Sequence, residues 1–221
     1  IRTFEWKWEA TALPINAPYC PITCEPCTTT HTYYTLIAAP QAPLAEPWTD
    51  VLDLACNWAN GQTSATGTAT EITEYLYNCG FEYDADQGHY RYYVYYMQFN
   101  LEFIISDLSG PTEIKVNCQD MAMAVVTFGN ALGSDLNLSR YYGGFPVNCI
   151  NPIGSASPTN NVFSSLLIHH DCRNGTFGYH EFAENANHDV WDATLEYDID
   201  SNPDNVNGSN PECGTITSGY S

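Results

Sequence analysis

The chain has 221 residues, enough for one ordinary domain with a substantial core, and a formal net charge of −20. Six residues are Lys or Arg, against 26 Asp and Glu. Because binding to a phosphate backbone is driven by Lys and Arg, this composition argues against nucleic acid as a partner. No apolar run reaches the ~18 residues that a membrane-spanning helix requires, so we expect no membrane span.

Cysteine content indicates the cellular compartment. Nine cysteines combined with only two lysines are typical of an extracellular or periplasmic protein. The chain begins at Ile1 without a methionine, and we expect a secreted product whose signal peptide has been removed. Three Asn-x-Ser/Thr triplets, at Asn137, Asn174 and Asn207, are glycosylation acceptors if the protein is made in a eukaryote.

The N-terminal part predicts a strand followed by a Cys/Pro-rich segment. Residues 1–12 alternate in polarity, which is typical of an amphipathic strand. Its aromatic side chains fall on one face: Phe4, Trp6 and Trp8. Such a strand is a candidate for self-assembly by addition to a neighbour's sheet. Residues 13–30 contain too many prolines for a regular element. We expect residues 1–47 to pack on a main domain at 48–221.

A further strand is predicted over residues 32–38, and two helices follow it. Apolar positions at helical spacing favour a helix over residues 48–58 and a second over 68–78. Cys56 and Cys79 lie at the ends of these helices, so a disulfide between them would clamp a helical hairpin.

Residues 90–103 contain seven aromatic side chains. An aromatic stripe at helical spacing is usually part of a core. The alternative is a stacking platform beside a cleft, suited to a polysaccharide or to an aromatic side chain. The sequence leaves both interpretations open.

Cys118 is placed at the start of a predicted helix. Asn117 is a good N-cap, Asp120 follows three residues later, and apolar residues continue at helical spacing to Gly133, a plausible C-cap. The partial positive charge at a helix N-terminus favours thiolate over thiol, which makes a cysteine nucleophilic. Since nine cysteines cannot all pair within one chain, we predict that Cys118 is the single free thiol. The alternative is a disulfide half or a packed core thiol.

The remaining cysteines suggest a disulfide framework. Cys149 and Cys172 bracket a strand predicted over residues 162–169 and are placed to bridge. Cys213 would then pair within the N-terminal group, which consists of Cys20, Cys24 and Cys27. The predicted domain is therefore stapled by disulfides.

Residues 177–195 read as a β-hairpin around a polar, Asn-rich turn. If the turn centres on Ala186, His180 directly opposes Asp192, and opposed Cβ atoms lie about 4.5–5.5 Å apart. A carboxylate at that distance can hold an imidazole nitrogen. A slip of one residue would break the pairing, and His188 is then the rival base.

Two segments resemble metal sites. Adjacent histidines in a strand point to opposite faces, so His169 and His170 are poorly placed to share one ion. Oxygen-bearing side chains recur at every second position after residue 197, a spacing that suits a calcium loop. These candidate calcium ligands are Asp198, Asp200, Asn202 and Asp204. An acidic turn without a metal is the alternative.

The segments around Cys118, His180 and Asp192 together resemble the transglutaminase-like superfamily. The resemblance is carried by Cys118-Gln119-Asp120-Met121-Ala122, by His180, and by Val190-Trp191-Asp192-Ala193-Thr194, in the order Cys, His, Asp. It implies an α+β, papain-like domain in which a central helix packs on an antiparallel sheet, with the histidine and aspartate on adjacent strands. The family often carries a tryptophan close to its cysteine and histidine, where this chain has Asn117 and Tyr179.

The sequence therefore predicts a secreted, thiol-dependent acyl-transfer enzyme. Cys118 would attack a carbonyl, His180 would shuttle the proton and Asp192 would orient the imidazole. We expect hydrolysis of an amide or peptide bond in a protein, peptide or cell-wall/glycan substrate, with no required cofactor and with one structural calcium as a candidate. The alternatives are a non-catalytic structural or assembly module with the same fold, and a polysaccharide-binding or polysaccharide-cleaving protein.

Overall fold

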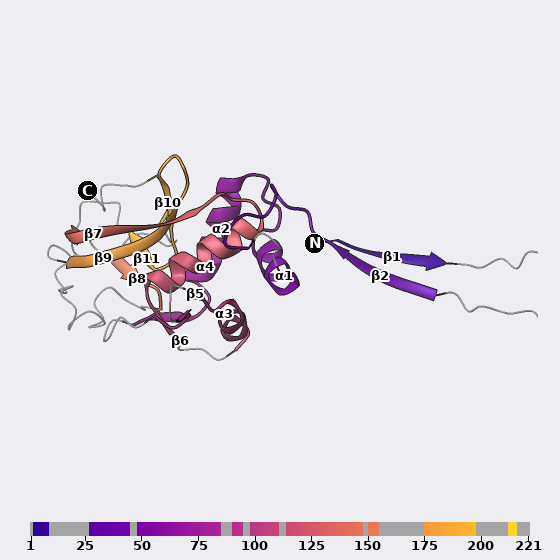
Figure 1. Cartoon of the computed structure of the whole chain (residues 1–221), viewed down its shortest axis with the longest axis horizontal. Coiled ribbons are helices and arrows are strands. Elements are labelled where there is room, and N and C mark those ends of the chain that lie inside the picture. Colours follow the sequence, from indigo (N-terminus) through magenta and orange to yellow (C-terminus); the bar gives the residue numbers. More distant parts are fainter. Residues whose placement is uncertain are drawn as a thin grey trace, which may run out of the picture. The chain divides into compact units, whose positions relative to one another are not determined.

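The computed structural model describes residues 2–8, 27–44, 48–84, 90–94, 98–110, 114–147, 150–154, 175–197 and 212–215 (Figure 1). The chain divides into two compact units, residues 1–35 and 36–221, which are described separately. The division lies earlier in the chain than the predicted boundary at residue 47.

The first unit contains a two-stranded antiparallel sheet. It pairs β1 (Arg2–Trp8) with β2 (Cys27–Tyr33) in continuous register from Arg2↔Tyr33 to Trp8↔Cys27. β1 confirms the strand predicted within residues 1–12. β2 begins earlier than the strand predicted over residues 32–38. The threonines that follow Cys27 are β-branched and favour extended backbone, so the strand already includes them. Residues 9–26 lie outside the described part.

The second unit is built around helix α4 (Cys118–Ala131), all of whose residues are buried except Met123. Helices α1 (Thr49–Trp58) and α2 (Ala65–Tyr77) pack on it, and a four-stranded sheet packs on it as well. Figure 1 shows α4 running beside the strands of that sheet. The helix predicted to begin at Cys118 is confirmed, and the second unit is α+β.

The four-stranded sheet is antiparallel, with the order β12-β10-β9-β7. Its strands are β7 (Asn137–Val147), β9 (Gly175–Glu184), β10 (Asp189–Asp192) and β12 (Glu212–Thr215). Of these, β9 makes the most extensive contact with α4, followed by β10 and β7. The sheet therefore presents β9 and β10 to the central helix.

Short strand pairs complete the described part of this unit. β3 (Phe81–Tyr83) pairs in parallel with β6 (Ile114–Val116), and β8 (Ile150–Pro152) pairs with β11 (Leu195–Tyr197). β4 (Tyr93–Val94) pairs with β5 (Gln98–Phe99), and helix α3 (Leu101–Leu108) follows. β6 leads through Asn117 directly into α4, so β3 and β6 lie at the N-terminal end of the central helix.

The predicted disulfide between Cys56 and Cys79 is wrong, because both are free thiols. α1 and α2 each pack more extensively on α4 than on each other, so their ends are not clamped together. Cys118 is also free. It is therefore not the single free thiol of the chain. Cys20, Cys24, Cys149 and Cys172 lie outside the described residues.

The aromatic segment at residues 90–103 is divided between the core and the surface. Tyr92 is fully buried and its ring contacts Phe81, Phe99 and Phe103. Tyr90, in contrast, is 56 % exposed. The core interpretation is right for Tyr92, which cannot belong to a surface platform.

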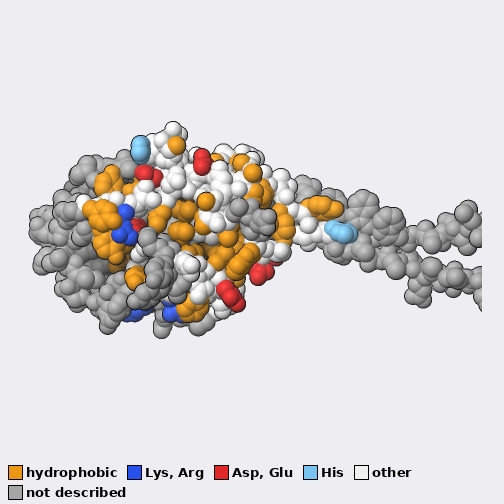
Figure 2. All heavy atoms as spheres, viewed as in Figure 1, with side chains coloured by type: hydrophobic (Ala, Val, Ile, Leu, Met, Phe, Trp, Pro, Cys, Tyr) orange, Lys and Arg blue, Asp and Glu red, His pale blue; other side chains and the backbone are white. Residues whose placement is uncertain are grey.

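The described acidic side chains do not gather in one place on the face shown in Figure 2. They appear there as separate spots among apolar and uncharged polar surface. Within the described residues, no helix is long and apolar enough to cross a membrane.

Gly133 ends α4 in a left-handed conformation, with φ +92°. The backbone N–H groups of Ile37 and Ala38 donate to the carbonyl of Leu132 at 3.1 and 3.3 Å. A Cβ on Gly133 would lie 2.7 Å from the backbone nitrogen of Ala38. Residues 36–44 thus belong to the second unit because they pair with the end of α4.

Gly133→Ala should lower the free energy of unfolding by about 2–4 kcal/mol, since backbone strain is added to a clash with Ala38. Gly61→Ala is the matched control, because Gly61 has the same φ of +92° but nothing within 4 Å of its Cβ position. It should cost only about 1–2 kcal/mol from strain alone. Urea denaturation of both variants measures the difference, and equal losses would show that the Ala38 contact is unimportant.

Candidate active site

A reciprocal capping box fixes the start of α4. Asn117 Oδ1 accepts a hydrogen bond from the Asp120 backbone N–H at 3.0 Å, and Asp120 Oδ2 accepts one from the Asn117 N–H at 3.3 Å. This places Cys118 as the first residue of the helix, where unpaired backbone N–H groups favour a negatively charged sulfur. Cys118 is only 3 % exposed.

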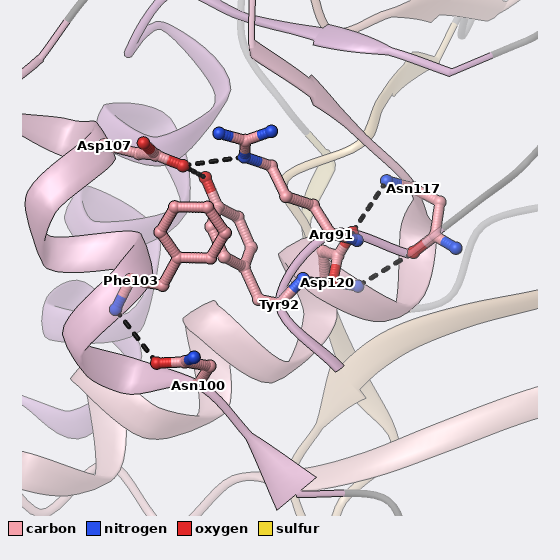
Figure 3. A network of polar contacts seen from close by, with 7 residues as sticks. All are labelled: Arg91, Tyr92, Asn100, Phe103, Asp107, Asn117 and Asp120. Carbon is pink, nitrogen blue, oxygen red and sulfur yellow. Dashed lines mark hydrogen bonds and ion pairs between the residues drawn. The ribbon is translucent and has the colours of Figure 1, made fainter. Parts of the chain in front are cut away.

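Asp120 also holds a distant segment against the helix. Its two carboxylate oxygens accept hydrogen bonds from the backbone N–H groups of Arg91 at 2.7 Å and Tyr92 at 2.8 Å (Figure 3). Because Asp120 is fully buried, these bonds replace the water that its charge would otherwise require. The segment that carries Tyr90 is thereby held near the N-terminal end of α4.

The same segment is anchored on its other side by α3. Arg91 Nε and the Tyr92 hydroxyl both donate to Asp107 Oδ2, at 2.7 and 3.0 Å (Figure 3). The Arg91 guanidinium also lies 4.7 Å from the centre of the Phe103 ring. Asp107 and Asp120 therefore fix residues 91 and 92 between two helices.

His180 and Asp192 form a buried pair on adjacent strands. His180 Nε2 lies 2.6 Å from Asp192 Oδ2, and the two residues are 0 % and 1 % exposed. The other carboxylate oxygen of Asp192 accepts the Thr194 backbone N–H at 2.8 Å. The contact that the sequence predicts between His180 and Asp192 is present.

The predicted register of the hairpin, however, is wrong by two positions. Val190 pairs with Glu184 and Trp191 with Ala183, so the turn includes Asn187 and His188 and does not centre on Ala186. Asp192 is therefore a diagonal neighbour of His180 and not its direct partner. An even shift keeps both side chains on the same sheet face, and diagonal neighbours about 7–8 Å apart remain within reach of long side chains.

The charge of His180 is governed by its neighbours. Burial by itself lowers the pKa of the imidazole, but the charge and hydrogen bond of Asp192 and then the hydrogen bond and charge of Cys118 raise that pKa to about 10. These neighbours favour the charged, imidazolium form of His180, which is paired with Asp192. With Nε2 bound to Asp192, Nδ1 is the ring nitrogen available to the sulfur.

Two tyrosines that the sequence did not single out also belong to this cluster. Burial raises the pKa of Tyr83 well above its usual value, as do the charges of Cys118, Tyr179 and Asp192. Burial and then Cys118 raise the pKa of Tyr179. Tyr179 could have been suspected because it precedes His180, whereas nothing near Tyr83 in the sequence signals its role.

The rival base His188 does not belong to the site. It lies in the turn with φ +65°, its side chain is 77 % exposed, and its Nδ1 is 3.4 Å from Glu184 Oε2. The bond to Glu184 ties it to its own hairpin and not to Asp192.

The metal expectations fall mostly outside the described residues. The residues that the structure does not describe include the candidate calcium ligands Asp198, Asp200, Asn202 and Asp204, the pair His169 and His170, and the sequons at Asn174 and Asn207. Asn137, the third sequon, is exposed at the start of β7. Where the structure does describe the chain, no group of three or more His, Cys, Asp or Glu side chains is placed to hold a metal ion.

Comparison with protein-family models, with curated proteins and with solved structures gave no match. The function is therefore argued from the site itself.

Asp120→Ala should lower the free energy of unfolding by about 3–5 kcal/mol, because it leaves three backbone N–H groups without their acceptor. Asp50→Ala provides a control, since Asp50 is an exposed acid in the first turn of α1 and its removal should cost no more than about 1 kcal/mol. Chemical denaturation monitored by circular dichroism compares the two. Similar small losses in both variants would contradict the anchoring role of Asp120.

The His180–Asp192 pair should make stability depend on pH. A folded-state pKa raised from 6.5 to about 10 contributes stability that is complete below pH 6.5 and is lost as the pH rises through the raised value. The free energy of unfolding should therefore exceed that of Asp192→Asn at pH 6, and the difference should shrink by pH 10. Both proteins carry Cys118→Ala, so that thiol ionisation does not contribute; because Cys118 also raises the pKa of His180, the loss in this background begins at a lower pH than in the parent chain. A difference that stays constant over this range would contradict the pairing.

Proposed function

We propose that the chain is a thiol-dependent acyl-transfer enzyme that uses Cys118, His180 and Asp192. The observation that carries the proposal is the 2.6 Å contact between His180 Nε2 and Asp192 Oδ2, formed beside a cysteine at a helix N-terminus. Nucleophile, base and orienting carboxylate are the groups that acyl transfer requires.

Each residue has a defined role in the proposed reaction. His180 accepts the proton of Cys118, and Asp192 stabilises the imidazolium. The sulfur attacks the substrate carbonyl carbon, His180 passes its proton to the leaving amine as the C–N bond breaks, and water then hydrolyses the thioester with His180 as base. The Cys118 backbone N–H supplies part of the oxyanion hole.

The papain-like, transglutaminase-like fold is part of this proposal. It is supported by α4, which begins with the nucleophile and packs on an antiparallel sheet, and by β9 and β10, which carry the histidine and the aspartate. We propose a secreted enzyme that hydrolyses a protein, peptide or cell-wall substrate.

The other free thiols are poor competitors for a reactive probe. Burial raises the pKa of the Cys79 thiol to about 12 and also raises the pKa of Cys56. Both therefore remain protonated at neutral pH, where the thiolate is the nucleophile. Among the three free thiols that the structure describes, labelling at pH 7 should therefore report on Cys118.

One observation favours a second candidate function, a non-catalytic secreted module. Cys118 and His180 are 3 % and 0 % exposed, so a substrate carbonyl has little access to the sulfur in this conformation. A module of this kind would keep the cluster as part of its core.

The two candidates are separated by acyl-enzyme formation with an amide or ester probe, detected by mass spectrometry. Cys118→Ala should abolish it, and His180→Ala should lower its rate about a hundredfold or more. Asp192→Asn should cause a smaller loss, because it leaves the base in place. The matched control His188→Ala should behave as the unmodified chain. Equal rates in the parent and in His180→Ala, with Cys118 intact, would favour the non-catalytic module.

A further inference from the structure

Tyr83 lies beside the start of the central helix. In the parallel pair of β3 and β6, Tyr83 is in register with Val116, two residues before Cys118. The backbone N–H of Asp84 donates to the Val116 carbonyl at 2.7 Å. These bonds fix the end of β3 to the segment that leads into α4.

A chain of hydrogen bonds also connects Tyr83 to the orienting carboxylate. The Tyr83 N–H donates to the Ile153 carbonyl at 3.0 Å, and the Ile153 N–H donates to the Thr194 carbonyl at 2.8 Å. The Thr194 N–H in turn donates to Asp192 Oδ1 at 2.8 Å. The backbone of Tyr83 is therefore positioned from both the Cys118 side and the Asp192 side of the cluster.

Gly154 holds β3 in this place from behind. It has a φ of +78°, and a Cβ there would lie 2.5 Å from the Phe81 carbonyl oxygen and 2.7 Å from the Glu82 Cα. Only glycine permits so close an approach between the two backbones. The backbone of β3 therefore packs directly against the backbone at Gly154.

The Tyr83 side chain belongs to the cluster around the nucleophile: Tyr83 is in register with Val116, just before Cys118, and the charge of Cys118 is among the causes that raise the pKa of its phenol. Burial, together with the negative charges around it, raises the pKa of the phenol well above its usual value. The phenol therefore keeps its proton over the working pH range, and in a hydrogen bond with Cys118 it is the donor. Cys118 therefore shares one cluster with two groups that can donate a hydrogen bond, the imidazole of His180 and the hydroxyl of Tyr83.

We propose that Tyr83 donates a hydrogen bond to the Cys118 thiolate and is a fourth catalytic residue of the acyl-transfer site. This inference rests on the proposed function. The proton of the Cys118 thiol passes to His180, while Tyr83 keeps its own proton through every step. By stabilising the thiolate, Tyr83 allows the nucleophile to be present at a lower pH than His180 alone permits.

The test is the pH dependence of iodoacetamide labelling at Cys118, followed by mass mapping in the full chain. Tyr83→Phe keeps the ring and removes only the donor, so the profile should shift upward by about one to two pH units. Tyr92→Phe is the matched control: Tyr92 is a buried tyrosine whose hydroxyl donates to Asp107. Its profile should coincide with that of the parent chain.

Three outcomes decide the matter. An upward shift in Tyr83→Phe alone supports the proposal. An unchanged profile in Tyr83→Phe, with a shift in His180→Ala, overturns the role of Tyr83 and leaves the proposed function intact. No shift in either variant overturns both.

If Tyr83→Phe does not fold, 3-fluorotyrosine at position 83 replaces it. This more acidic phenol donates a stronger hydrogen bond, so the labelling profile of Cys118 should shift to lower pH. An unchanged profile overturns the role of Tyr83.

Discussion

The buried carboxylate of Asp120 is the interaction on which the rest of the site depends. A charged group without exposure to water must be surrounded by donors, and Asp120 obtains three from the backbone of residues 91, 92 and 117. One side chain thus sets where α4 begins and how the segment at residues 90–94 docks. The position of Cys118 at the helix end follows from the same bonds.

The site also depends on the sheet, which places His180 near the N-terminal end of α4. β9 and β10 pack on α4, and the diagonal contact between His180 and Asp192 keeps the imidazole charged within the core. A buried imidazolium is stable only beside negative charge, which Asp192 provides. The start of α4 and the paired strands β9 and β10 therefore bring Cys118, His180 and Asp192 into one buried cluster.

Local signals in the sequence were sufficient for part of this arrangement. Asn117 and Asp120 predict the start of α4 because a capping box involves residues three positions apart. Alternation along the hairpin predicts that His180 and Asp192 share a face, and an error of two in the register preserves that result.

Long-range contacts were not predictable in the same way. Nothing in the sequence places Tyr83 beside Cys118, since that contact depends on the parallel pairing of β3 with β6 across α3. The disulfide inferred between Cys56 and Cys79 failed for a related reason. The ends of two consecutive helices need not meet, and a disulfide requires Cα atoms within about 7 Å.

The parallel pairing of β3 with β6 also bears on how the chain folds. Tyr83, Cys118, His180 and Asp192 are far apart in sequence, so the cluster forms only after several long loops have closed, and such contacts form slowly. Until then Cys118 is an unprotected thiol in a chain with eight other cysteines. During oxidative refolding, the docking of β9 on α4 thus competes with thiol–disulfide exchange, and the yield of native protein depends on which process is faster.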